Sequence, residues 1–80
     1  MMITVATVRF AYTYYDLELI AELTSAFRNR KEAESWVNDT EARKLEAYRQ
    51  EAGTYCRGTF NLTADDFELD FFSLQDLYLN

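Results

Sequence analysis

The first third of the chain alternates between apolar and polar residues. Residues 3–15 are rich in valine, threonine, tyrosine and phenylalanine, which favour strands because β-branched and aromatic side chains pack well on a pleated surface. Over residues 15–27 the odd positions are mostly apolar. Glu18 and Glu22 lie on the opposite face, where Ile20 is the only large apolar residue. This period of two predicts a second strand that pairs with the first.

A helix over residues 15–27 is the alternative. Asp16 would cap this helix, and every third or fourth residue from Leu17 to Phe27 would line its buried side. The strand fits the alternation more closely, although residues 13–16 include none that enters left-handed backbone space easily for a tight turn. We therefore expect a hairpin.

The middle of the chain carries helix signals. Asn29 and Glu32 have the spacing of a capping box, and Ala33, Trp36 and Val37 follow at helical spacing. This pattern predicts an amphipathic helix that starts after Asn29. Trp36 lies on its apolar side, so we expect the indole to anchor the core.

A second helix start lies at Asn38 or Asp39, where Glu41 can reach back to the backbone. Gly53 stands where a left-handed glycine closes a helix, so we expect the helix to end there. The pattern does not decide whether Asn38 and Asp39 separate two helices or lie within one. Residues of this segment recur at three- and four-residue intervals on one apolar side: Ala42, Leu45, Tyr48 and Ala52.

The last third contains two segments. Residues 54–62 are typical of a strand, with Gly58 at a bulge or bend. Residues 64–72 fit two structures equally well. In a strand, apolar residues from Phe67 to Phe71 alternate with acidic ones; in a helix, an acidic first turn leads into an apolar stripe.

Together these elements predict an α+β fold. We expect a small antiparallel sheet of three to four strands with one or two helices packed on one face, in a single compact domain over residues 1–80. No stretch of about 18 apolar residues and no signal-peptide pattern occurs, so no membrane association is expected. The single Cys56 indicates a reducing compartment, and we expect a cytoplasmic protein.

Composition excludes several functional classes. The chain has 14 acidic residues, 8 basic residues and no histidine, with a net charge of −6. Nucleic acids and anionic membranes attract an excess of lysine and arginine, so direct nucleic-acid binding is not expected. Without histidine there is no Ser-His or Cys-His pair, and one cysteine does not build a zinc site. We therefore expect a non-enzymatic protein with no metal and no cofactor.

The negative charge is concentrated toward the C-terminus. Residues 1–27 hold three acids against one base (net −2), residues 28–57 hold six against seven (net +1), and residues 58–80 hold five against none (net −5). The expected aromatic contacts are Phe72, Tyr78 and Tyr14, since tyrosine and phenylalanine are favoured at interfaces. The expected acidic partner-binding face consists of Asp65, Asp66, Glu68, Asp70, Asp76, Asp16, Glu18 and Glu22.

The carboxylates allow two interpretations. In a strand, Asp66, Glu68 and Asp70 project from one face at intervals of about 6.6–6.8 Å, and such a row imitates a row of phosphates. Like charges gathered on a sheet cost stability, which indicates a basic partner. That partner is either another protein or the arginines of this chain, in which case the acidic face is only solvated.

The arrangement resembles, in general style and without a shared motif, the small α+β proteins encoded among phage and mobile-element accessory genes. The acidity and the missing catalytic groups favour a small inhibitor that binds the basic surface of a nucleic-acid-binding host protein. Such an inhibitor would be of the anti-restriction or anti-CRISPR type and would mimic nucleic acid. The alternative is a homo-oligomerising structural or regulatory module, such as a homodimer formed through an edge strand or an antitoxin-like partner of a basic protein.

Overall fold

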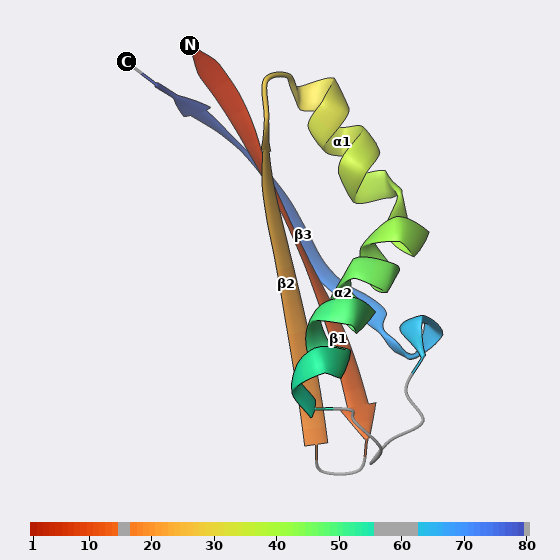
Figure 1. The fold of residues 1–80 in the computed structure, drawn as a ribbon. Helices are drawn as coiled ribbons and strands as arrows, with labels where there is room; N and C mark the ends of the chain where they lie inside the picture. Colours follow the sequence, from red (N-terminus) through yellow and green to blue (C-terminus); the bar gives the residue numbers. More distant parts are fainter. Residues whose placement is uncertain (15–16, 56–62, 80) are drawn as a thin grey trace.

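The computed structural model describes residues 1–14, 17–55 and 63–79, with the backbone alone for Tyr14, Leu17 and residues 51–55. Three strands form one antiparallel sheet in the order β2-β1-β3, and two helices pack against it (Figure 1). The predicted α+β fold is confirmed. The elements in chain order are β1 (Met2–Tyr14), β2 (Leu17–Phe27), α1 (Arg30–Asn38), α2 (Thr40–Tyr55), the 3₁₀ turn η1 (Ala64–Asp66) and β3 (Glu68–Tyr78).

The hairpin of β1 and β2 confirms the strand prediction for Leu17–Phe27. The two strands pair without a register shift from Thr4 opposite Phe27 to Tyr14 opposite Leu17. Leu19 and Ala21 are buried, while the residues between and beside them are exposed, as a period of two requires. The alternation of apolar and polar side chains therefore predicted the structure of this segment correctly.

The C-terminal segment is a strand, which settles the open choice between strand and helix. β3 pairs with β1 along its whole length, with a bulge where the register shifts between Arg9 and Phe10. Most β3 side chains are exposed, so burial imposes little alternation on them. Backbone pairing with β1 holds this segment as a strand. The pattern of apolar and polar residues in β3 gives no sign of that pairing.

The break between the two helices lies at Asp39. The Asn29 side chain accepts a hydrogen bond of 2.8 Å from the backbone N–H of Glu32, which confirms the predicted cap of α1. The backbone N–H of Asp39 donates to the Ser35 carbonyl and ends α1. The Asp39 side chain then accepts from the Ala42 N–H at 3.3 Å and starts α2. One residue thus closes the first helix and caps the second.

The predicted end of the second helix at Gly53 is wrong, because α2 continues to Tyr55. Glycine inside a helix costs about 1 kcal/mol relative to alanine, and α2 absorbs this cost rather than turning there. Thr54 and Tyr55 accordingly belong to the helix and not to a strand. The remainder of the predicted strand, with Cys56 and Gly58, lies outside the described residues.

The core lies between one face of the sheet and the two helices. Trp36 packs against Phe27 with ring centroids 5.7 Å apart, as expected of an anchor from α1. Phe67, fully buried just before β3, lies 6.0 Å from the ring of Tyr12. Alanines on the facing surfaces allow a close approach of helix and sheet. The buried cluster comprises Ala6, Val8, Phe10, Ala21, Ala33, Val37, Ala47 and Phe67.

Arg43 is buried where α1 meets α2. Its Nη1 donates to the Trp36 carbonyl at 3.3 Å, its Nη2 pairs with Glu46 at 2.9 Å, and its guanidinium lies 4.6 Å from the centre of the Trp36 ring. The arginine thereby satisfies a carbonyl near the end of α1. The predicted apolar side of the second helix is wrong at Leu45, which is 40% exposed, because Arg43 and Ala47 take the inward positions.

Candidate protein-binding face of the sheet

The sheet has one face that no described helix or strand covers. Thr4, Ala6, Val8 and Phe10 of β1 are buried under the helices, so the odd residues of β1 point the other way. Residues that pair across an antiparallel sheet share a face, which extends this assignment to β2 and β3. We call this surface the open face. It consists of Ile3, Val5, Thr7, Arg9, Ala11, Thr13, Glu18, Ile20, Glu22, Thr24, Ala26, Glu68, Asp70, Phe71, Ser73, Gln75 and Leu77.

Arg9 is the centre of the acidic half of the open face. Its Nη2 lies 3.2 Å from the Glu22 carboxylate on β2, and its Nη1 lies 3.9 Å from the Asp70 carboxylate on β3. Its guanidinium carbon lies 5.3 Å from the centre of the Phe71 ring. The bulge in β3 brings both Asp70 and Phe71 to Arg9, so one guanidinium joins all three strands.

Two further carboxylates extend this acidic half. Glu18 lies opposite Thr13, and Glu68 lies opposite Ala11, which is flanked on its other side by Ile20. Within the described part of the chain, neither Glu18 nor Glu68 forms an ion pair. Since Arg9 is the only base in the three strands, four carboxylates face one guanidinium and leave a net charge of −3.

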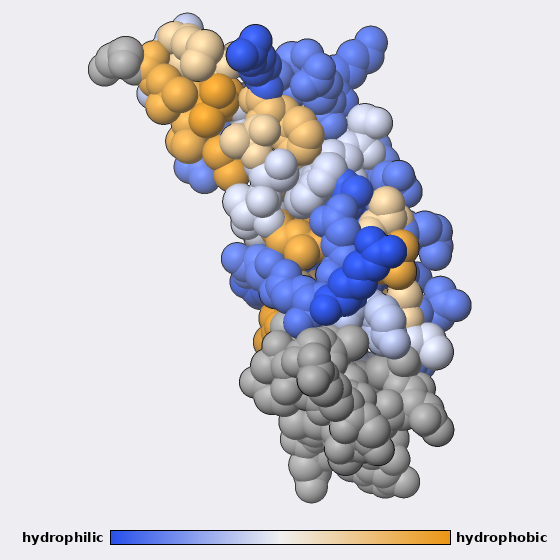
Figure 2. Space-filling model, in the orientation of Figure 1, coloured by the Kyte–Doolittle hydropathy of each residue, from blue (hydrophilic) through white to orange (hydrophobic). Residues whose placement is uncertain are grey.

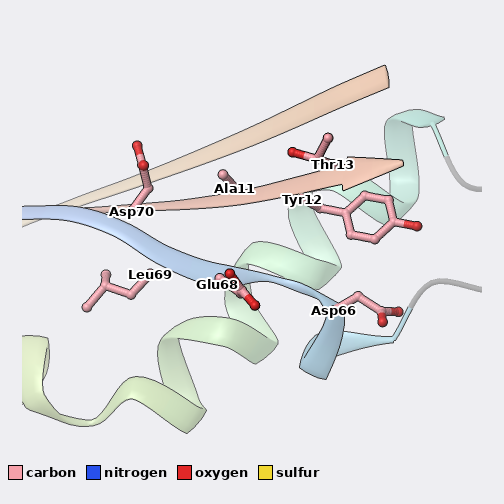
Figure 3. A pocket seen from close by; sticks show the side chains of 7 residues that line it. All are labelled: Ala11, Tyr12, Thr13, Asp66, Glu68, Leu69 and Asp70. Atoms are coloured by element: carbon pink, nitrogen blue, oxygen red, sulfur yellow. The ribbon is translucent and has the colours of Figure 1, made fainter. Parts of the chain in front are cut away.

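A shallow hollow of about 270 Å³ adjoins this half of the sheet (Figure 3). Figure 3 shows the carboxylates of Asp66, Glu68 and Asp70 pointing in different directions around it. Among the described residues, no group of three or more acidic, cysteine or histidine side chains is arranged to hold a metal ion. The hollow is lined by Ala11, Tyr12, Thr13, Asp66, Glu68, Leu69 and Asp70.

The other half of the open face carries no charge. A row of hydroxyl side chains crosses its middle, where the Oγ1 atoms of Thr7 and Thr24 lie 3.3 Å apart. Beyond this row, β1 and β3 continue past the end of β2 as a two-stranded ribbon that ends at both termini (Figure 1). Figure 2 shows apolar residues gathered over this ribbon. Its open-face residues Ile3 and Leu77 are apolar, and Tyr78, on the helix side, is 81% exposed. The sheet therefore runs from an acidic end to an apolar end.

The predicted acidic residues do not form a single row. Asp66 lies in η1 before the strand, where its carboxylate accepts a hydrogen bond of 2.7 Å from the Thr63 N–H. Asp76 lies on the helix side of β3 and pairs with Arg30 at 3.0 Å. Asp65 is exposed in η1, outside the sheet. Asp66 and Asp76 thus make contacts inside the chain.

Four of the predicted carboxylates, Glu18, Glu22, Glu68 and Asp70, come together on the open face. Asp16 and the Tyr14 side chain lie outside the described residues. Of the predicted aromatics, Phe72 is 53% exposed and, like Tyr78, lies on the helix side of the sheet edge.

Two residues of the site were missed by the sequence interpretation, namely Arg9 and Phe71. Arg9 is the only base in the strands, and it occupies a polar position in an alternating segment. Alternation along a strand could have been read from the sequence, and it places Arg9 on the face opposite Val8 and Phe10. The pairing of Phe71 with Arg9 depends on the bulge, for which the sequence carries no signal.

Comparison with known protein families, with curated proteins and with solved structures gives no match. Over the described residues, none of the helices combines the length and the apolar character needed to cross a membrane. The site must therefore be interpreted from its own chemistry.

Proposed function

We propose that this chain is a non-enzymatic protein-binding module whose open face engages a basic surface of another protein. The observation that carries the proposal is the excess of carboxylates on the open face, where Glu18, Glu22, Glu68 and Asp70 share one side of the sheet with the single base Arg9. On α1 and α2, Arg30, Arg43 and Lys44 pair with other acids, and among the described residues no base of these helices forms an ion pair with the open face. A basic partner would supply the missing positive charge.

The layout of the four carboxylates supports a nucleic-acid mimic. Glu18 and Glu22 lie on β2, and Glu68 and Asp70 lie on β3, with β1 between them. Since neighbouring strands lie about 4.8 Å apart, the two acidic rows are roughly 10 Å apart. This separation is of the same order as the widths of the minor and major grooves of DNA, about 6 and 12 Å, across which its two phosphate rows face each other. A protein that binds nucleic acid presents bases at comparable spacing.

The concrete form of the proposal is a small inhibitor of a nucleic-acid-binding host protein, of the anti-restriction or anti-CRISPR type, acting in the cytoplasm. It would occupy the basic groove of its target and exclude the nucleic acid. Ile20 and Phe71 lie among the carboxylates and would give the interface an apolar centre. Charge would then govern the rate and specificity of association, and these side chains would contribute apolar contact.

Capture from a bacterial lysate with two matched variants tests the proposal. The face variant carries Glu18→Gln, Glu22→Gln, Glu68→Gln and Asp70→Asn; the helix variant carries Glu32→Gln, Glu34→Gln, Glu41→Gln and Glu46→Gln, so both lose four negative charges. Proteins bound by the wild type and the helix variant should be lost with the face variant. An excess of duplex DNA should also displace them.

Two results would count against the proposal. Partners that the face variant retains as well as the wild type does, or that duplex DNA leaves bound, would contradict the mimic. Loss of the same partners from both variants would show an effect of total charge rather than of the open face.

A further inference from the structure

β3 has a free edge that is suited to pairing. β1 occupies one side of β3, and no described strand pairs with the other side. From Phe71 to Tyr78 the edge contains no bulge, proline or lysine, which are among the features that usually prevent strand edges from associating. The only charge in this stretch is Asp76, which is paired with Arg30 and hydrogen-bonded to Thr4. The described part of the chain therefore leaves this edge of β3 unpaired, with its one charge balanced inside the chain.

The hydrogen bonds at the termini show which backbone groups of this edge are free. Leu79 donates from its N–H to the Met1 carbonyl at 2.7 Å and accepts from the Met1 ammonium at 2.9 Å, so both of its backbone groups point to β1. Along an antiparallel pair this orientation alternates, and the register is continuous from Phe71 to Tyr78. The residues whose backbone groups point outward are therefore Phe72, Leu74, Asp76 and Tyr78.

We infer that two copies of this chain pair through these edges as antiparallel strands, which makes one six-stranded sheet. Outward-pointing residues must pair with one another, so only registers that place even residues opposite even residues are allowed. The register we assign places Phe72 opposite Tyr78 of the partner subunit and Leu74 opposite Asp76 of the partner subunit. Gln75 then faces Gln75 of the partner subunit on the two-fold axis.

The neighbouring registers are less favourable. A shift of two residues in one direction places Asp76 opposite Asp76 of the partner subunit, and like charges directly opposite destabilise a strand pair. The same shift in the other direction places Phe72 opposite Asp76 of the partner subunit and Tyr78 opposite the bulged Asp70 of the partner subunit. Only the assigned register covers both exposed rings, Phe72 at 53% and Tyr78 at 81%, with each other.

The charge of the open face does not oppose this dimer. In the assigned register, Asp70 lies five residues from the axis, so the Asp70 residues of the two copies are roughly 34 Å apart along the strands at 3.4 Å per residue. This separation exceeds the Debye length of about 8 Å at physiological ionic strength. The two acidic halves lie at opposite ends of the same side of the sheet, so the dimer stands whether or not the open face binds a basic protein.

Cysteine cross-linking tests the register directly in a Cys56→Ser background. Gln75→Cys should form an intermolecular disulfide, because directly opposite residues in a non-hydrogen-bonded pair have Cα atoms about 4.5 Å apart. Ser73→Cys should not cross-link, since four residues would separate the two sulfurs along the strands. A disulfide through Ser73→Cys or Leu74→Cys in preference to Gln75→Cys would overturn the register.

Sedimentation over a concentration series tests the dimer itself. The wild type should sediment with about twice the 9.4 kDa monomer mass. Phe72→Glu or Tyr78→Glu should raise the concentration at which half of the dimer has dissociated by at least about tenfold. Leu45→Glu, which adds the same charge at an exposed position of α2, should not. Circular dichroism checks that each variant folds, and two glutamate sites are available if one does not. A wild type that stays monomeric throughout would overturn the inference.

Discussion

The hydroxyl of Thr4, buried on the helix side of β1, donates a hydrogen bond of 2.7 Å to the carboxylate of Asp76 on β3. The other oxygen of Asp76 lies 3.0 Å from Arg30, which also pairs with Glu34 at 3.4 Å. One carboxylate therefore joins β3, β1 and α1. Part of the acidity of the C-terminal segment serves the fold, and only the remainder is available to a partner.

Removal of the Asp76 carboxylate should destabilise the chain. Asp76→Ala leaves the buried Thr4 hydroxyl without its acceptor, and we expect the free energy of unfolding to fall by about 1–3 kcal/mol. Urea denaturation measures the loss. The double substitution Thr4→Val with Asp76→Leu should recover part of it, because neither polar group is then left unpaired. The exposed Asp65→Ala serves as control, and an equal loss in both single variants would contradict the role of Asp76.

Arg43 should be more important for stability than its neighbour Lys44. Arg43→Met removes the hydrogen bond to the Trp36 carbonyl and the contact with its ring, and we expect a loss of about 1–3 kcal/mol. Lys44→Met, which removes only a surface ion pair of 3.8 Å, should change stability by about 0.5 kcal/mol or less. Trp36 is the only tryptophan, so its emission should shift in the Arg43 variant alone. Unchanged emission would argue against the stacked arginine.

The cap of α1 should contribute measurably to stability. Asn29→Ala removes the acceptor for the Glu32 N–H and should cost about 0.5–2 kcal/mol in urea denaturation. Asn29→Ser retains a capping oxygen and should restore most of the loss. Equal stability of the alanine and serine variants would show that the cap does not hold α1.

The carboxylates of the open face should lower the free energy of unfolding of the chain. Glu18 and Glu68 share one face with Glu22 and Asp70 and lack ion-pair partners among the described residues, so Glu18→Gln with Glu68→Gln should stabilise the chain by about 0.2–1 kcal/mol. The gain should shrink as added salt screens the repulsion. Glu41→Gln, at the start of α2 beside Lys44, should instead destabilise slightly. A loss of stability in the double variant would contradict the excess charge.

The parts of the fold that sequence predicts well are those fixed by local chemistry. The N-cap at Asn29 needs only a side-chain oxygen at the correct spacing, and the hairpin strand Leu17–Phe27 must place one set of side chains under the helices. The break at Asp39 could be located only to within a residue. The helix end predicted at Gly53 was wrong because glycine permits a left-handed helix end without requiring one.

The candidate site was predictable only in part because it depends on pairing between distant segments. β3 is mostly exposed on both faces, so its residues carried no reliable period, and its bulge at Asp70 had no sequence signature. Charge counting identified an acidic C-terminal segment correctly. It did not separate Glu68 and Asp70, which reach the open face, from Asp76, which the register places opposite Thr4.

The most direct measurement of the central claim is a calorimetric titration of a captured partner with the wild type, the face variant and the helix variant at two salt concentrations. If the open face binds a basic surface, the face variant should lose at least about tenfold in affinity, equivalent to about 1.4 kcal/mol, and most of the salt dependence. The helix variant should stay within about twofold of the wild type. Equal affinities for the face variant and the wild type, with the same salt dependence, would contradict the account.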